Sequence, residues 1–418
     1  MLSRLAETPI ASSSWGLRRV ATLLLRPRMT KLGRLRPIPN ACDDPQEDRL
    51  LKTPLFDRRD FLRAAGASFA SAMAPSAWAK TLAADAVFAT AFIKRDGSYG
   101  AAILSEAGMV LHAIDLPARG HDVTFDPVSK RSVVFARQPG TFAVVFDHTG
   151  RDEPLTIASV SGRHFFGHGV FSTDGALLYA TENDFDNAAG VVGVYDARAK
   201  FKRIGEFPTY GMGSHELLLL GDGRTIAVAN GGIETHPDFG RAELNIATMK
   251  PSYVLVDRLA GDLVEKHELP PALHQLSIRH MDIDRSGTVW FGCQYRGPGT
   301  DRPLLVGRAA RGKDLQLLDM PQDVLSGFRN YIGSVAANPA AGTVAVSSPE
   351  GNSLAVIDTA SGRIVATNAL VEVCGVAPDG ASFIATTGAG EIIEARGATR
   401  SEPDYVWDNH MLRIEEAG

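Results

Sequence analysis

Short apolar segments separated by glycine-containing turns run through the sequence from residue 87 to its end. Residues 87–92, 99–104 and 109–116 alternate or run apolar, with turns such as Asp96-Gly97 and Ala107-Gly108 between them. This pattern is typical of β-strands joined by tight turns. No segment shows an apolar stripe long enough for a helix, so the sequence predicts an all-β protein.

A strand opening that begins with a polar residue recurs along this pattern. Histidine occupies it at His121, His168, His215 and His280, then Ser334 and Cys374 replace it, and His410 restores it. Third strands that end in aspartate recur as well, at Asp147, Asp196, Asp257 and Asp358. The openings are separated by 47, 47, 65, 54, 40 and 36 residues. Four-stranded units of about 40–50 residues are the period of β-propeller blades.

Seven openings predict seven blades. The last opening, His410, leaves room for one strand before Gly418, whereas residues 87–116 supply three strands without an opening strand of their own. A carboxy-terminal innermost strand that completes the amino-terminal blade would close the ring and remove its open edges. The predicted fold is therefore a seven-bladed β-propeller of the YVTN/WD40-like kind, forming a single domain over residues 80–418.

Residues 1–79 have the character of a targeting segment. The run DRRDFLR at residues 57–63 precedes a moderately apolar stretch that ends at Ala77-Trp78-Ala79. This order predicts a twin-arginine signal that is cleaved near Ala79, with export of the folded chain to the periplasm. The alternative, a membrane anchor, is disfavoured because the apolar stretch is shorter than the roughly 18 residues that span a bilayer. Translation could begin at Met1 or at Met29.

Charge and cysteine content limit the kinds of partner, cross-link and cofactor that we expect. Residues 1–79 hold 13 of the 43 Lys+Arg and 7 of the 48 Asp+Glu, which leaves 30 against 41, a net charge of −11, in residues 80–418. An acidic propeller argues against nucleic acid or anionic lipid as a partner. Cys42 lies in the predicted signal segment, and Cys293 and Cys374 lie in different repeats. We therefore expect neither a disulfide framework nor a haem attachment site.

The repeated histidines are the strongest chemical feature. In a propeller the first strand of each blade lines the central channel, so the five opening histidines should converge at one channel mouth. Imidazole is the commonest transition-metal ligand and titrates near neutral pH, which predicts a site for a metal or an anionic ligand. The candidate metal ligands are His121, His168, His215, His280 and His410, and the candidate ions are iron, copper and zinc. Alternatively, repeat duplication copied a polar residue that only caps a loop or contacts channel water.

Four further residues are candidates for holding a ligand at the same mouth: Arg279, Arg329, Tyr331 and His236. Packing between blades or hydrogen bonding within a loop is the alternative for them. His236 belongs to the long insertion at residues 229–251, whose mixed composition favours an ordered loop. Asp122 and Glu216, which follow histidines, are expected to bond the adjacent blade because neighbouring residues of a strand face opposite ways. No G-x-S-x-G, H-E-x-x-H or Walker motif is present.

Several longer motifs occur along the repeats: GHGVFS at residues 167–172, YATEND at 179–184, ANGGIETHP at 229–237, SIRH at 277–280 and WDNH at 407–410. Together they resemble a bacterial exported propeller family, domain of unknown function 1513. The resemblance covers residues 85–415. It implies a twin-arginine-exported periplasmic protein, commonly encoded beside imelysin-type iron-uptake proteins and a dihaem peroxidase-like protein, and it brings no catalytic residue with it.

Three hypotheses for function follow. The first is a periplasmic accessory protein of iron uptake that binds a metal or metal complex at its histidine ring. The second is a periplasmic metal-dependent redox enzyme. The third is a scaffold that docks an imelysin-type or other periplasmic partner and whose histidines are structural. Tight metal retention separates the first two from the third, and turnover separates the second from the first.

Overall fold

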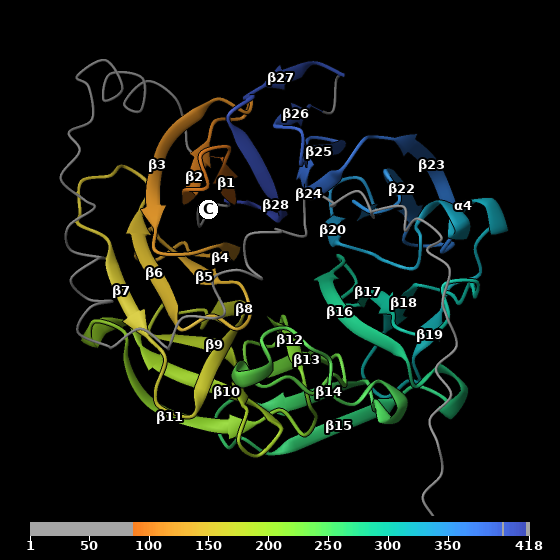
Figure 1. The fold of residues 1–418 in the computed structure, drawn as a ribbon, viewed down its shortest axis with the longest axis horizontal. Helices are drawn as coiled ribbons and strands as arrows, with labels where there is room; N and C mark the ends of the chain where they lie inside the picture. The colour runs from red at the N-terminus through yellow and green to blue at the C-terminus, as the bar shows by residue number, and fades with distance from the viewer. Residues whose placement is uncertain (1–86, 395–396, 415–418) are drawn as a thin grey trace, which may run out of the picture. The chain divides into compact units, whose positions relative to one another are not determined.

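The computed structural model describes residues 87–394 and 397–414, which form seven antiparallel sheets of four strands each. Figure 1 shows the sheets as blades around a common axis. Successive innermost strands contact one another from β4 through β24 to β28 and back to β4, so the ring is closed. The predicted seven-bladed β-propeller is confirmed. The predicted signal at residues 57–79 lies outside the described residues.

Each blade has its innermost strand at the central axis, and its other strands follow outward in chain order. From the inside outward, the first blade contains β28 (Tyr405–Arg413), β1 (Phe88–Lys94), β2 (Tyr99–Leu104) and β3 (Val110–Leu116). The second blade contains β4 (Gly120–Asp126), β5 (Arg131–Ala136), β6 (Phe142–Asp147) and β7 (Leu155–Ala158). The third contains β8 (Arg163–Phe171), β9 (Leu177–Asp184), β10 (Ala189–Asp196) and β11 (Lys202–Pro208). The fourth contains β12 (Ser214–Leu219), β13 (Thr225–Asn230), β14 (Ser252–Asp257) and β15 (Leu263–Glu268). The fifth blade contains β16 (Leu276–Ile283), β17 (Val289–Tyr295), β18 (Val306–Ala309) and β19 (Gln316–Leu317). The sixth contains β20 (Ser334–Asn338), β21 (Thr343–Ser348), β22 (Ser353–Asp358) and β23 (Ile364–Ala369). The seventh contains β24 (Val373–Asp379), β25 (Ser382–Thr387), β26 (Glu391–Ile393) and β27 (Thr399–Ser401).

The carboxy-terminal strand closes the ring as predicted. β28 pairs antiparallel with β1, from Phe88 opposite Arg413 to Lys94 opposite Tyr405. Buried side chains of both strands pack together, with the Trp407 and Phe92 ring centroids 6.1 Å apart. Burial of these large aromatic side chains stabilises the closure. Closure also gives the inner edge of β1 a partner strand.

The aspartates at the ends of third strands shape the turns that follow. Asp147 accepts the N–H of Thr149 at 2.7 Å, and Asp358 accepts the N–H of Ser361 at 2.8 Å. These are turns in which an aspartate side chain replaces a backbone acceptor. The repeated aspartate therefore has a structural reason and marks the turn into the outermost strand of its blade.

The innermost strands that carry histidine depart from regular pairing near that histidine. β4, β8, β12, β16 and β28 each contain a register shift at or next to their histidine. β20, which carries Ser334 instead of histidine, pairs regularly with β21, from Ser334 opposite Ser347 to Asn338 opposite Thr343. β24, which carries Cys374, does contain a register shift. A bulge bends a strand and re-aims its side chains. The bulges therefore help to set the direction of the imidazoles.

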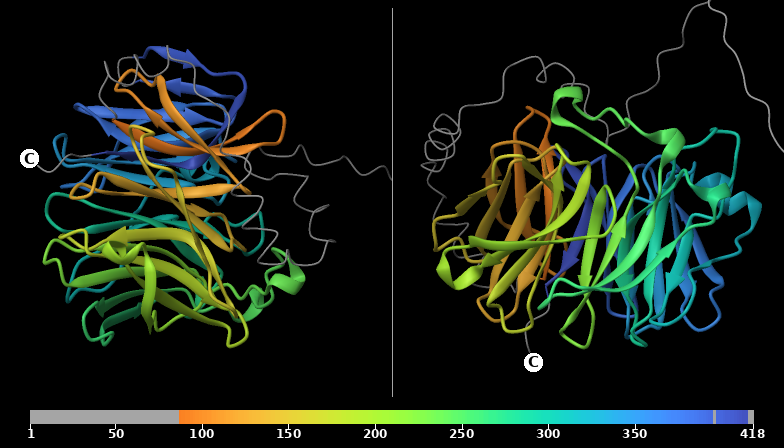
Figure 2. Two further views of the ribbon diagram at one scale, coloured as in Figure 1. Left: turned by 90° about the vertical axis from the view of Figure 1, so that its left-hand side faces the viewer. Right: turned by 90° about the horizontal axis from the view of Figure 1, so that it is seen from below.

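The long insertion in the fourth blade is ordered, as its composition predicted. It contains two short 3-10 helices, η3 (Pro237–Phe239) and η4 (Ile246–Thr248), and rises as a green segment beyond the strands at one face of the propeller in Figure 2. Asn245 holds it together, because its side chain accepts the N–H of Glu234 at 2.7 Å and donates to the carbonyl of Gly232 at 2.9 Å. Other short helices are η2 (Ala197–Ala199), η5 (Pro271–Leu273) and α4 (Gln322–Gly327). Within the described ranges, no helix has the length and apolar character needed to cross a membrane.

Candidate metal centre

The five opening histidines meet inside the propeller. His121, His168, His215, His280 and His410 are each buried, with at most 9% of the residue exposed. Taken in that order, neighbouring ring centroids lie 4.9, 4.8, 4.7 and 4.7 Å apart, and His410 returns to His121 at 4.6 Å. The predicted convergence is confirmed. We call these five residues the histidine cluster.

Two small residues accompany the contact between His280 and His410. The blades of β20 and β24 lie between the blades that carry these histidines, yet the two imidazole centroids are only 4.7 Å apart. The intervening positions hold Ser334 and Cys374, both buried. Because neither side chain is as large as an imidazole, the rings of His280 and His410 can approach each other across these blades. The Cys374 thiol donates to the carbonyl of Glu372 at 3.2 Å, and it is not bonded to the sulfur of Cys293.

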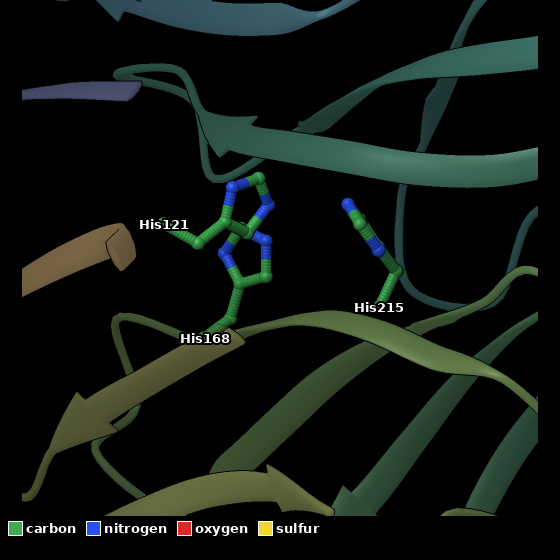
Figure 3. A group of neighbouring side chains, drawn as sticks. All are labelled: His121, His168 and His215. Atoms are coloured by element: carbon green, nitrogen blue, oxygen red, sulfur yellow. The ribbon is translucent and has the colours of Figure 1, made fainter. Parts of the chain in front are cut away.

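Two groups of three nitrogen atoms are close enough to share an ion. One comes from His121, His168 and His215, the other from His168, His280 and His410, and within each group the atoms lie within 4.8 Å of one another. Figure 3 shows the first group, with three rings gathered from separate parts of the chain. Two nitrogens on one tetrahedral ion lie about 3.3 Å apart when each bond to the metal is about 2.0–2.1 Å. Small side-chain adjustments would therefore bring three imidazoles onto one ion, and His168 belongs to both groups.

Several nitrogen atoms of the cluster have no hydrogen-bond partner. They are Nε2 of His168, His215 and His410, and Nδ1 of His280, all of them buried. A buried polar atom without a partner costs about 1–3 kcal/mol. Four such atoms in one cluster indicate a site built for a ligand that binds nitrogen lone pairs.

Carboxylates stand behind three of the imidazoles. Nδ1 of His121 lies 3.0 Å from Oδ1 of Asp408, and Nδ1 of His168 lies 3.2 Å from Oδ2 of Asp122. Glu216 lies 3.5 Å from Nδ1 of His280 without a hydrogen bond to it, so the carboxylate support is complete for His121 and His168 only. A carboxylate at Nδ1 favours the tautomer that leaves Nε2 free to bind a metal. This arrangement is common around metal-bound histidines in proteins.

The expectation for Asp122 and Glu216 is confirmed, and the structure adds detail to it. Each contacts the adjacent blade: Asp122 reaches His168 of β8, and Glu216 accepts the N–H of Met281 in β16 at 3.0 Å. The residue that follows one histidine therefore bonds the next blade, through the histidine itself for Asp122 and through the backbone beside the histidine for Glu216.

The imidazoles of His121, His215, His280 and His410 are held in their neutral form. Burial lowers the pKa of His121, His215 and His280 well below its usual value, and positive charge on His410 or Arg279 would lower it further. Burial likewise lowers the pKa of His410 to about 4, although Asp122 opposes the shift. Neutral imidazole is the form that binds metal. At neutral pH these histidines therefore need not lose a proton before they bind an ion.

The pKa values of two carboxyl groups near the cluster, those of Asp408 and Glu216, are shifted in opposite directions. Burial opposes ionisation of Asp408, but Arg119 and His121 hold the pKa of that carboxyl well below its usual range. Burial, together with the charge of Asp122, raises the pKa of Glu216 well above its usual range. A cation in the cluster would favour the ionised form of Glu216, because opposite charge lowers a carboxyl pKa.

A cavity of about 50 Å³ lies beside the cluster, with His215 and Arg279 in its lining. Residues of the insertion, including Thr235 and Arg241, line it as well. The cavity therefore joins the histidine cluster to the loop that rises from the propeller face. Of the four additional candidates from the sequence, Arg279 is the one that lines this cavity.

The other three candidates lie elsewhere in the structure. Tyr331 is buried, and its hydroxyl accepts a hydrogen bond from Asn409 of β28 at 2.8 Å, so it links two blades. Arg329 is exposed, just after α4, with φ 48°. His236 caps η3, because its Nδ1 accepts the N–H of Asp238 at 3.2 Å. None of the three is in the cavity lining, and their contact with a ligand stays a prediction.

Sequence reasoning missed Asp408 and Arg119. Asp408 is buried and lies between Nδ1 of His121 at 3.0 Å and Nε of Arg119 at 2.8 Å. One signal was available: Asp408 precedes His410 by two positions in one strand, and residues two apart share a face of a strand. Nothing in the local sequence, however, indicates that its partners are 287 and 289 residues away.

Comparisons with known proteins agree with this fold. A family model described as "Protein of unknown function (DUF1513)" matches residues 114–414. Among solved structures, the chain is similar to Kuenenia stuttgartiensis hydrazine synthase, with a TM-score of 0.53 and 12% identity over 78% of this chain and 95% of that one. It is also similar to the Cps50 (Swd1) β-propeller domain of Myceliophteria thermophila, with a TM-score of 0.50 and 10% identity over 77% and 96%. At such identities the similarity shows the fold alone, and no curated protein matches the sequence significantly.

Proposed function

The chain belongs to the protein family DUF1513, and we propose that this β-propeller binds one transition-metal ion in its histidine cluster. One observation carries the proposal: buried imidazoles from five blades converge, and four of them keep a buried nitrogen without a hydrogen-bond partner. A cluster needed only for packing would gain little from four unsatisfied polar atoms, since each costs about 1–3 kcal/mol. A metal ion would satisfy several of them at once.

The chemistry of the ligands limits the metal. Neutral imidazole suits zinc, copper, iron and nickel, whereas oxygen ligands suit magnesium and calcium. Affinity alone would favour copper over zinc and zinc over iron(II), so the ion bound in the cell depends also on which metal is supplied. We keep iron, copper and zinc as the candidates.

For the cellular role we propose an accessory protein of iron uptake in the periplasm, which captures an ion or metal complex and hands it to a partner. Its support is the twin-arginine pattern at residues 57–63 and the resemblance to a family encoded beside imelysin-type iron-uptake proteins. An imelysin-type protein is accordingly the partner we propose. The acidic charge of residues 80–418 agrees with a protein partner rather than nucleic acid.

The test is the metal content of the protein that is produced from the full-length chain, exported through its own amino-terminal segment and purified without chelators. We expect close to one equivalent of iron, copper or zinc per chain by elemental analysis. After removal with a chelator, the same ion should rebind on titration. A His168→Ala/His215→Ala/His280→Ala variant should be metal-free while its circular dichroism spectrum remains that of a β-protein. Wild-type protein that is purified metal-free and takes up none of the three ions would refute the proposal and favour a docking scaffold.

Neutralising the carboxylate behind His168 is expected to weaken metal binding. Asp122→Asn keeps the shape of the side chain but removes the negative charge 3.2 Å from Nδ1 of His168. Loss of such a partner typically lowers metal affinity by about 10- to 100-fold. Competition with a chromophoric chelator measures the change. Asp282→Asn is the control, since Asp282 is also an innermost-strand carboxylate but accepts the N–H of Ala337 at 2.7 Å. An equal loss of affinity in both variants would contradict a specific role for Asp122.

A further inference from the structure

The cavity beside His215 has a polar wall that the metal proposal does not use. Its lining includes Gln138 from the blade of β4, Arg241 and Glu243 from the insertion, and Ser277 and Arg279 from β16. His215 of the histidine cluster lies in the same wall. At about 50 Å³ the cavity has room for a small ligand or a few water molecules.

Two side chains in this wall are donors with unsatisfied atoms. Oγ of Ser277 has no hydrogen-bond partner, although Ser277 is fully buried. Nε of Arg279 is also buried without a partner, while Nη1 of the same guanidinium donates to Gln294 at 2.5 Å. Because a buried unsatisfied donor is costly, two of them in one cavity wall indicate an acceptor that binds there.

The backbone leaves room for one of these donors. A Cβ at Gly231 would lie 2.6 Å from Oγ of Ser277. Any side chain at position 231 would therefore displace the Ser277 hydroxyl or fill the space beside it. Glycine at this point of the insertion keeps the serine accessible from the cavity.

Positive charge predominates around the cavity. Arg137 lies near the positive charges of Arg119 and Arg241 and the negative charge of Asp408. Arg279 lies near Tyr331, the positive charges of Arg296 and Arg137, and the negative charge of Glu243. In the cavity lining itself, Arg241 and Arg279 are cationic and Glu243 is anionic. Asp408 also contacts Arg119 at 2.8 Å, and Glu243 contacts Arg296 at 2.5 Å.

Burying several guanidinium groups near one another is unfavourable in free energy, and a bound anion would reduce that repulsion. Burial, with the nearby charges of Arg119 and Arg241, lowers the pKa of Arg137 to about 10. Guanidinium groups bind carboxylates and oxyanions strongly, because several N–H donors meet oxygen acceptors in one plane. Gln138 and Ser277 supply neutral donors beside them.

We propose that this cavity binds a small oxygen anion, a carboxylate or an inorganic oxyanion, with Arg279 and Ser277 as donors. The site goes beyond the proposed function, because the anion is recognised by the propeller wall whether or not the histidine cluster holds a metal. Since His215 lies in the same wall, an anion here would sit next to the cluster. Small carboxylates and inorganic oxyanions are the class of molecule that the site would accept.

The experiment uses chelator-treated full-length protein at constant ionic strength, with acetate, bicarbonate and phosphate as separate probes and chloride as the reference. We expect saturable binding of at least one probe by isothermal titration calorimetry, together with a rise in Tm that chloride does not cause. Acetate and bicarbonate test for a carboxylate or carbonate group, and phosphate tests for a tetrahedral oxyanion. Because the protein is metal-free, the result does not depend on whether the cluster binds metal.

Single replacements in the cavity wall test whether the anion binds there. Arg279→Gln should weaken binding of the probe by at least about tenfold, because it removes a charged donor. Ser277→Ala, which changes one buried hydroxyl and is tolerated more easily by the fold, should weaken it by about fivefold. Arg224→Gln serves as the control, since Arg224 is exposed and pairs with Asp257 at 2.6 Å. Absence of saturable binding of all three probes, or equal binding by wild type and both cavity variants, would overturn the proposal.

Discussion

Replacing His168 with alanine is expected to weaken the binding of a transition-metal ion by more than about hundredfold, more than any other single replacement in the cluster. His168 contributes to both groups of three nitrogen atoms, whereas His121, His215, His280 and His410 each contribute to one. The other four variants leave one group complete. Loss of a partner behind a ligand already costs about 10- to 100-fold, so loss of the shared ligand should cost more.

The measurement is competition against a chromophoric chelator, with His215→Ala alongside as the variant that keeps one group complete. His164→Gln is the matched control: it lies in the same strand, β8, and is buried, but its ring nitrogens contact the carbonyl of Phe165 and the side chain of Asn183. If His164→Gln reduced affinity as much as His168→Ala, disruption of β8 would explain both results. If His168→Ala kept wild-type affinity, neither group would describe the site.

The metal-free protein is expected to lose stability as the pH falls from about 6.5 to 4. Unfolded histidines titrate near pH 6.5, whereas burial lowers the pKa of four cluster histidines in the folded state. Between the two values the unfolded chain binds protons that the folded chain does not, so acid favours unfolding. For His410, a change from 6.5 to about 4 corresponds to about 3 kcal/mol at 1.36 kcal/mol for each unit.

Other titratable groups change how steeply the stability of the metal-free protein falls with pH, but the fall remains. Burial lowers the pKa of His164 to about 4, which adds to the loss in the same range. Glu216 acts in the opposite direction, because its raised pKa means that the folded state binds a proton before the unfolded state does. Asp408 contributes only in stronger acid, because its stabilising effect is lost below the ordinary carboxyl range.

Thermal unfolding of chelator-treated protein from pH 7.5 to 4.5 tests this expectation. Wild-type Tm should fall steadily below about pH 6.5, and His410→Gln should show a shallower fall because one of the titrating groups is gone. Metal-loaded protein should keep its ion through most of this range, since protons compete for the His410 nitrogens only as the pH approaches the lowered pKa of about 4. A wild-type Tm that stays constant between pH 7 and pH 5 would contradict the lowered pKa values.

Much of the fold was predictable because a propeller repeats a local pattern. Alternating apolar segments identified the strands, and the spacing of the openings identified seven blades. The lone strand at His410 and the three strands at residues 87–116 predicted the closure, which the pairing of β28 with β1 confirms. Convergence of the five histidines then followed from the position of first strands in any propeller.

The support around the histidines was only partly predictable, because it depends on contacts between distant segments. Asp122 was expected to bond the adjacent blade, but its contact with His168 could not be identified without knowing how neighbouring blades align. Asp408 was missed because its partners lie in β4 and just before it. Arg329 was a candidate because it comes shortly before the opening at Ser334, and His236 because it belongs to the long insertion, yet the cavity lining includes neither.

The sequence by itself determined the number of blades, the way the ring closes and which residue type stands at each strand opening, since strand periodicity and repeat spacing are local properties. Only the tertiary structure decided which nitrogen atoms come within 4.8 Å of one another, which carboxylates stand behind them and where a cavity adjoins them. Those features depend on bulges that bend the innermost strands and on the small residues Ser334 and Cys374 between His280 and His410. Such effects arise only when blades far apart in the chain are packed around one axis.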